Sequence, residues 1–236
     1  MSTFIRQPVA CPRCGVVGDH EVATSVNAGR SPALRDAVLA ERFQVLTCDA
    51  CGHAFSYLGE FVYLDFDRSQ MIGVFPSSSE RSWPHCERET LDAYEPNLGR
   101  SAPAVARPFG EGMVVRCVFG LGALREKLVL ADAGLDDVAV EAAKLDLLRS
   151  LDGPALVPGR RLRLVEAGTD EVAFALPPAA EDPDQRPSRL PVSRAALDGY
   201  LAAASSDERL LSILGAGPYV DLGRLLIAPE PAPSHP

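Results

Sequence analysis

Two short stretches decide how this chain folds: Cys11-Pro12-Arg13-Cys14-Gly15 and Cys48-Asp49-Ala50-Cys51-Gly52. Each holds two cysteines separated by two residues, so one tight turn brings both thiolates to the same ion. The glycine after each pair can adopt a positive φ, which lets backbone N–H groups point at the sulfur atoms. Two such turns facing each other supply four thiolates in a tetrahedron, which suits Zn²⁺. We therefore predict one zinc ion bound by Cys11, Cys14, Cys48 and Cys51.

Other interpretations of these four cysteines explain less. Four unrelated reduced cysteines would not produce two matched Cys-x-x-Cys-Gly units. A thioredoxin-like dithiol needs only one pair, at the start of a helix that follows a strand, and neither pair here leads into a helical pattern. The gap of 33 residues between Cys14 and Cys48 is longer than in a minimal zinc ribbon. The strand, helix and strand predicted there form an insertion that returns the chain to its start. Four thiolates leave no ligand position for water, so we expect a structural site.

The composition favours a soluble globular protein of the cytoplasm. Of 236 residues, 47% are hydrophobic and 23% are charged, which excludes a disordered or coiled-coil chain. The net charge of −9 argues against general binding to nucleic acid or to anionic membranes. No apolar run reaches the roughly 18 residues of a membrane span, and residues 1–10 do not resemble a signal peptide. In the cytoplasm the six cysteines are expected to be reduced or bound to metal.

The pattern along the chain predicts an α+β fold in four parts. Residues 1–76 form a zinc-knuckle, zinc-ribbon-like β unit, and residues 77–156 supply a loop, a strand and an αα-hairpin. Residues 157–228 form a C-terminal β-hairpin with helices, and residues 229–236 form a disordered tail.

Within these parts the periodicity predicts individual elements. Strands are expected over 20–27, 43–47, 54–58, 61–66, 71–75, 113–119, 161–165, 171–176 and 219–227. Helices are expected after Ser31-Pro32 and over 84–94, 123–131, 136–151, 193–204 and 207–214. Residues 95–112 are expected to be a loop and 177–191 a Pro-rich linker.

A second group of polar residues lies in apolar strands. Tyr63 and Asp65 share one face of a predicted strand, and Asn27 is expected on a neighbouring strand. Arg116 lies in another apolar strand, where a buried guanidinium needs a carboxylate. We predict an Asp65–Arg116 ion pair inside the fold. The alternative is a polar ligand or enzyme site near Tyr63, Asp65 and Arg116.

The remaining candidates have structural interpretations. Cys117 is typical of a small buried hydrophobe. Cys86 follows His85, but adjacent residues usually point apart, so a nucleophile pair is disfavoured. Charges at helical spacing, such as Glu141 and Lys144, usually lie on a solvated face. We assign no catalytic and no cofactor-binding residue. His20 and His53, beside the knuckles, are expected to support the site or lie on the surface.

The first knuckle resembles the motif that names the CpXC domain, a functionally uncharacterised bacterial and archaeal family. The likeness spans about residues 8–150 and is weaker around Tyr219-Val220-Asp221. It continues through Ser25-Val26-Asn27, Pro32-Ala33-Leu34-Arg35, Cys48-Asp49-Ala50-Cys51-Gly52, Tyr63-Leu64-Asp65, Val118-Phe119-Gly120, Leu124-Arg125-Glu126-Lys127, Leu135-Asp136-Asp137, and Glu141 with Lys144. The resemblance implies a metal-binding fold and no particular reaction. The long loop before Met113 and the Pro-rich stretch near Pro177 are peculiar to this chain.

These observations favour a non-enzymatic interaction or scaffold module, in which zinc fixes a small sheet that presents loops to a protein partner. An enzyme with its site near Tyr63, Asp65 and Arg116 is the first alternative. A zinc-ribbon protein that binds nucleic acid is the second. It would need a local basic patch, such as Arg30, Arg35 and Arg42, in an acidic chain.

Overall fold

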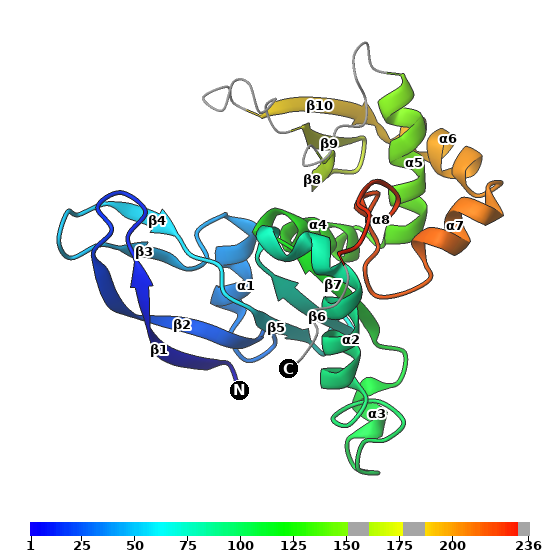
Figure 1. Cartoon of the computed structure of the whole chain (residues 1–236). Coiled ribbons are helices and arrows are strands. Elements are labelled where there is room, and N and C mark those ends of the chain that lie inside the picture. The colour runs from blue at the N-terminus through cyan, green and yellow to red at the C-terminus, as the bar shows by residue number, and fades with distance from the viewer. Residues whose placement is uncertain (151–160, 177–186, 231–236) are drawn as a thin grey trace. The chain divides into compact units, whose positions relative to one another are not determined.

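The computed structural model describes residues 1–150, 161–176 and 187–230. The chain forms two compact units, Met1–Leu124 and Arg125–Pro236, and each is described separately here. Both units combine helices with strands, so the α+β class is confirmed (Figure 1). Among the described residues, no helix has the length and apolar character needed to span a bilayer.

A five-stranded sheet in the order β1-β2-β5-β6-β7 forms the centre of the first unit. Its strands are β1 (Thr3–Ala10), β2 (Val17–Asn27), β5 (Phe61–Asp65), β6 (Gln70–Phe75) and β7 (Val114–Phe119). β2 runs parallel to β5, and β6 runs parallel to β7. Because parallel neighbours need a crossover, two long connections leave the sheet. The strand that we assigned to the second predicted part, β7, thus completes this sheet.

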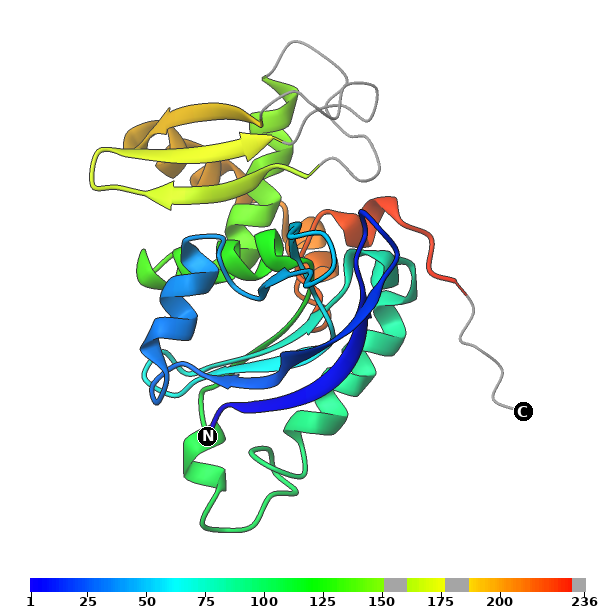
Figure 2. The ribbon, with the colours of Figure 1, turned by 90° about the vertical axis from the view of Figure 1, so that its left-hand side faces the viewer.

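The two crossovers carry the other elements of the first unit. The connection from β2 to β5 holds α1 (Pro32–Leu39) and a hairpin of β3 (Val45–Thr47) and β4 (Ala54–Ser56). The connection from β6 to β7 holds a 3₁₀ turn (Ser77–Ser82), α2 (Trp83–Tyr94) and α3 (Arg107–Gly110). Helices α1 and α2 lie on opposite sides of the sheet (Figure 2). Every residue of β6 is buried, as expected for a central strand covered on both faces.

The first strand of the sheet was not predicted. β1 pairs antiparallel with β2 from Thr3 to Ala10, yet only Val9 of this edge strand is buried. Its side chains therefore carry no clear alternation between apolar and polar residues. The exposed edge also explains why Pro8 is tolerated within the strand.

The second unit contains a three-stranded antiparallel sheet in the order β10-β9-β8, packed with helices. Its elements are β8 (Arg163–Ala167), β9 (Glu171–Leu176), β10 (Ser188–Ser193), α5 (Asp137–Arg149), α6 (Arg194–Ala204), α7 (Glu208–Leu214) and α8 (Gly223–Leu226). Helix α4 (Leu121–Asp132) begins in the first unit and continues into the second. Asp136 caps α5 by accepting a hydrogen bond from the Ala139 N–H at 2.8 Å.

Two secondary-structure predictions in this unit are wrong. The final part of the expected 177–191 linker is β10, an edge strand that tolerates Pro191 because none of the described strands pairs with its other side. The strand expected over 219–227 is a turn followed by α8. There the Asp221 carboxylate accepts the Gly223 N–H at 2.6 Å, which favours a turn over an extended chain. Residues 177–186 of the linker and 231–236 of the tail lie outside the described residues.

Candidate metal centre

The four cysteines of the two knuckles meet at one point. Their sulfur atoms all lie within 4.8 Å of one another. Cys11 Sγ is 3.8 Å from Cys51 Sγ, and Cys14 Sγ is 3.6 Å from Cys48 Sγ. A tetrahedral ion with metal–sulfur bonds of about 2.3 Å separates its ligands by about 3.8 Å, so the observed spacing fits such an ion.

The two knuckles have the same backbone conformation. In the first, the Gly15 N–H donates to the Cys11 carbonyl at 2.9 Å, and in the second the Gly52 N–H donates to the Cys48 carbonyl at 2.8 Å. The N–H groups of Cys11 and Cys48 each donate to a carbonyl five residues later, both at 2.9 Å. Gly15 and Gly52 have φ values of 74° and 67°, the left-handed conformation that the sequence predicted.

Backbone N–H groups point at the sulfur atoms and change how readily they ionise. Burial raises the pKa of Cys11, but the backbone N–H groups of Cys14 and Arg13 outweigh it and lower the pKa to about 7. For Cys51, a hydrogen bond from the His53 backbone favours the thiolate, but burial and the neighbouring thiols together raise its pKa to about 12. The four thiols thus compete for negative charge, and a cation at their centre would let all four ionise.

The hairpins that carry the knuckles are tied to each other by polar contacts. The Gln44 side chain accepts a hydrogen bond from the Ala23 N–H at 2.7 Å, which joins the β3–β4 insertion to β2. The side chain of Gln7, in β1, donates to the Tyr57 hydroxyl just after β4. These two contacts join the hairpins outside the turns that carry the four thiols.

The two histidines beside the knuckles contact an aromatic ring. His20 makes an edge contact and His53 a stacked contact with Phe55, at centroid distances of 6.2 and 6.3 Å. The four cysteines form a group that could hold a metal ion, and neither histidine belongs to that group. The histidines therefore pack beside the site, as expected.

The polar group around Asp65 is assembled differently from the prediction. Asp65 is fully buried and pairs with Arg35 at 3.6 Å and with Arg68 at 3.2 Å. The Tyr63 hydroxyl donates to the same carboxylate at 3.4 Å. Among the described contacts of Asp65, Arg35 takes the place that we assigned to Arg116.

Sheet topology explains this correction. β6 lies between the strands of Asp65 and Arg116, and Arg116 is aligned with Ile72 and, beyond it, with Tyr63. The Arg116 guanidinium donates to the Val115 carbonyl at 2.9 Å. Tyr63, Asp65 and Arg116 line neither of the two described pockets of the first unit. Neither pocket therefore lies at the predicted enzyme site.

The structure also shows where Asn27 and the proposed basic patch lie. Asn27 lies beside Leu64 across the parallel β2–β5 pair, and its side chain accepts a hydrogen bond from the Arg30 N–H at 3.1 Å. Arg35 of the proposed basic patch is nearly buried against Asp65, which removes it from a nucleic-acid surface. Arg30 and Arg42 are exposed.

Cys86 and Cys117 are buried outside the knuckles. Burial raises the pKa of Cys86 to about 12 and raises that of Cys117 further. The neighbouring His85 lies 3.4 Å from Glu89 on the same helix. Both thiols therefore stay protonated, as a structural role requires.

The helical charges that we placed on a solvated face are instead buried in the second unit. Glu141 and Lys144 are each 1% exposed, and Glu126 is fully buried. Lys144 Nζ lies 2.8 Å from Glu126 and 2.5 Å from Glu141. The prediction was wrong because spacing on one helix does not reveal which distant residues supply the partners.

Glu126 in turn has partners from the C-terminal part of the chain. Arg163 contacts Glu126 at 3.0 Å and Asp221 at 2.5 Å. Glu126 also accepts the Leu164 N–H at 2.5 Å, which ties α4 to β8. Burial opposes ionisation of Asp221, but Arg163 and Lys144 outweigh it and lower its pKa.

Four acidic and four basic side chains form these ion pairs, which together we call the buried ion-pair network. Among the described ion pairs, six of the side chains are connected to one another, and Lys127 pairs separately with Asp137 at 2.8 Å. The members of the network are Glu126, Lys127, Asp137, Glu141, Lys144, Arg161, Arg163 and Asp221. Burial raises the pKa of Glu141, whereas Lys144 lowers the pKa of Glu126 against the effect of burial. Because every charge has a partner of opposite sign, the network is consistent with a structural role.

The fold and the cluster of thiols define an α+β protein with a candidate metal centre built from two matched knuckles. A family model described as CpXC protein matches residues 9–144, which is more than half of the chain. The chain therefore belongs to the CpXC family, and the resemblance stated from its motifs is confirmed. No curated protein and no solved structure matches the chain.

Proposed function

We propose that Cys11, Cys14, Cys48 and Cys51 bind one structural Zn²⁺. The single observation that carries this proposal is the gathering of four sulfur atoms within 4.8 Å of one another by two knuckles with the same backbone hydrogen bonds. Thiolate-only ligands favour Zn²⁺ over Mg²⁺ or Ca²⁺, which prefer oxygen. Four protein ligands complete the coordination shell, so the ion would organise the hairpins without activating water.

Metal analysis of purified protein tests the assignment. Wild-type protein should contain about one zinc per chain, and Cys14→Ser should lose most of it. Cys86→Ser is the matched control, because this buried cysteine lies outside the knuckles and should leave the zinc content unchanged. Folded wild-type protein without metal, or with the absorbance of an iron–sulfur cluster, would contradict the proposal.

We further propose that the chain is a cytoplasmic interaction or scaffold module whose knuckle region docks a protein partner. Apolar side chains beside the knuckles support this proposal. Val16, Val17 and Val45 are 48%, 60% and 46% exposed, in the segments that the metal centre would fix. Exposed apolar residues grouped on a rigid element are typical of protein interfaces.

Affinity capture of partner proteins from lysates of the protein's own cells tests the docking surface. Partners retained by the wild-type chain should be lost from Val16→Lys and Val17→Lys variants that keep their zinc. Val105→Lys changes a more exposed valine outside the knuckle region, at 79% exposure, and should retain them. Partners that survive both knuckle variants, or a wild-type chain that captures nucleic acid, would contradict the proposal.

A further inference from the structure

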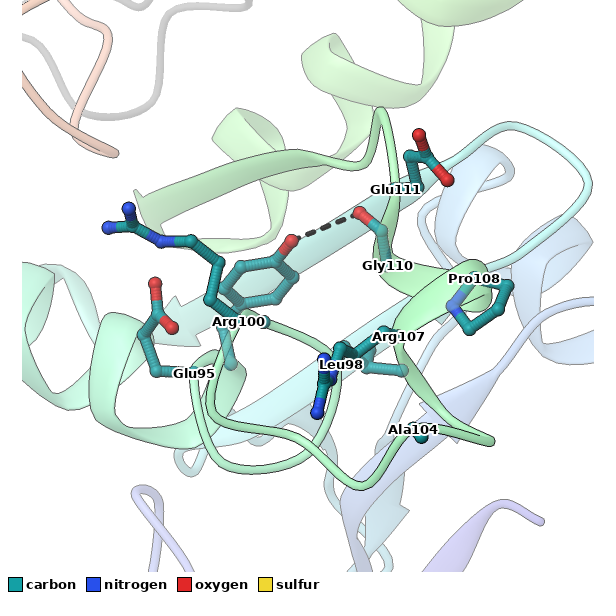
Figure 3. Close-up of a pocket in the computed structure, with 10 residues that line it drawn as sticks. Glu95, Leu98, Arg100, Ala104, Arg107, Pro108, Gly110 and Glu111 are labelled. Carbon is teal, nitrogen blue, oxygen red and sulfur yellow. Dashed lines mark hydrogen bonds between the residues drawn. The ribbon is translucent and has the colours of Figure 1, made fainter.

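A hollow in the first unit lies between the end of α2 and the loop that carries α3, a segment that we expected to be a plain loop (Figure 3). Its volume is about 420 Å³, and its walls come from residues 94–111. Pockets that bind small molecules typically enclose about 300–1,000 Å³. The hollow is therefore large enough for a small ligand.

The walls of this pocket are held by contacts within the loop. The Tyr94 hydroxyl donates to the Gly110 carbonyl at 3.0 Å. Gly110 packs so closely on Leu98 that a Cβ there would lie 2.0 Å from the Leu98 carbonyl oxygen. The two ends of the loop are thus joined across the pocket, and a ligand would not need to order the loop before binding.

Two arginines and two glutamates line the pocket without pairing with one another. Among the described contacts, no ion pair or side-chain hydrogen bond involves Arg100, Glu95 or Glu111. Arg107 donates to the Ala102 carbonyl through Nε at 2.9 Å, which fixes its guanidinium and leaves both Nη groups available. The pocket therefore offers positive and negative groups in equal number.

This balance indicates the charge of the ligand. A simple anion would meet two carboxylates, and a simple cation would meet two guanidinium groups, so each would be opposed by half of the charged lining. A ligand that carries both charges can pair with both signs. The apolar side chains of Leu98, Ala104 and Pro108 leave room for an uncharged body beside those charges (Figure 3).

We propose that this pocket binds a small zwitterion of the α-amino-acid type. Arg107 receives its carboxylate, because the anchored guanidinium loses little freedom on binding. Glu95 receives its ammonium group, because it is the less exposed of the two glutamates. Arg100 lies on the same side of the pocket as Glu95 in Figure 3 and, with Glu111, adds a weaker contribution from the rim.

Three matched probes test the requirement for both charges in the full-length, zinc-loaded protein. Leucine carries both charges, N-acetylleucine lacks the ammonium group, and leucinamide lacks the carboxylate. NMR titration of the Leu98, Gly99 and Gly110 amide signals should give a millimolar dissociation constant for leucine. Each singly charged probe should bind at least about tenfold more weakly, the equivalent of about 1.4 kcal/mol. Equal binding of all three probes would overturn the proposal. No response to leucine, phenylalanine or alanine would also overturn it.

Substitutions test whether Arg107 and Glu95 make the two proposed contacts with the ligand. Arg107→Gln and Glu95→Gln should each weaken leucine binding about tenfold, while Arg107→Lys should keep part of it. Arg88→Gln removes an exposed arginine of α2 outside the pocket and should bind leucine as the wild type does. Ala104→Trp should fill the hollow and abolish binding. Wild-type affinity in Arg107→Gln and Glu95→Gln, with unchanged signals elsewhere, would overturn the assignment.

Discussion

The knuckles of the first unit and the buried ion-pair network of the second unit both gather ionisable groups, but they neutralise charge in different ways. At the knuckles, four sulfur atoms lie 3.6 to 3.8 Å apart in two close pairs, and Cys14 and Cys51 are exposed. In the network, Lys144 contacts two carboxylates within 2.8 Å and is almost fully buried. In our proposal the first region depends on an ion from solution, whereas the second supplies its own counter-charges.

This difference has energetic consequences. The free energy of zinc binding to small four-ligand sites is about 10–16 kcal/mol, and it stabilises only the bound state. Buried ion pairs lose much of their attraction to desolvation, yet removal of one partner leaves an uncompensated charge. The first unit should therefore respond to metal supply, and the second unit should respond to substitution or acid.

Substitution within the network should have the largest effect. Lys144→Met leaves Glu126 and Glu141 buried beside each other and should destabilise the second unit by about 3–5 kcal/mol. Arg149→Met, on the same helix, breaks an exposed pair with Asp146 and should cost at most about 1 kcal/mol. Denaturant unfolding of both variants measures the difference. Equal losses would show that burial does not distinguish the two pairs.

Acid should weaken the same network. The pKa values of Asp221 and Glu126 are lowered in the folded protein. Their contribution is therefore fully present above the unfolded carboxylate pKa of about 4 and is lost as the pH falls toward the folded values. Glu141, whose pKa is raised, contributes in the opposite direction. Urea unfolding should show a net loss of second-unit stability from pH 5 to pH 3, and an unchanged midpoint would contradict the assignment.

A smaller effect is expected at the turn of one knuckle. Gly52 has a φ of 67° and an open space where a Cβ would lie, so Gly52→Ala introduces only backbone strain. The cost should be about 1–2 kcal/mol for the metal-bound protein. Gly199→Ala, at an equally open position within α6, should be neutral or stabilising. Thermal unfolding measures the change in stability of each variant. An unchanged stability of Gly52→Ala would show that the left-handed turn is not required.

The metal centre and the ion-pair network differ in how far sequence predicts them. Cys-x-x-Cys-Gly is a local signal, because two ligands and the turn that presents them lie within five residues. Glu141 and Lys144 also form a local pair, but their burial depends on Glu126, Arg163 and Asp221 from three other segments. Without those contacts, the pair looks like the exposed Asp146–Arg149 pair of the same helix.

Other differences between the predicted and the observed structure also arise from contacts between distant segments. The strands from β2 to β7 are recognisable from alternation or from short apolar runs, whereas β1 is an exposed edge strand that lacks both. The order of the strands, which separates Asp65 from Arg116, is set by the two crossovers and carries no local sequence signal. The pocket beside Arg107 arises from loop closure through Tyr94 and Gly110, which spacing alone does not indicate.

Hydrogen exchange with and without a chelator tests the central claim most directly, namely that a metal holds the knuckles while the second unit is self-sufficient. After chelation, amides in residues 9–17 and 45–56 should lose protection, and amides in helix α5 should keep theirs. Complete removal of the metal with unchanged exchange in both knuckle segments would contradict the claim, as would equal loss of protection in α5.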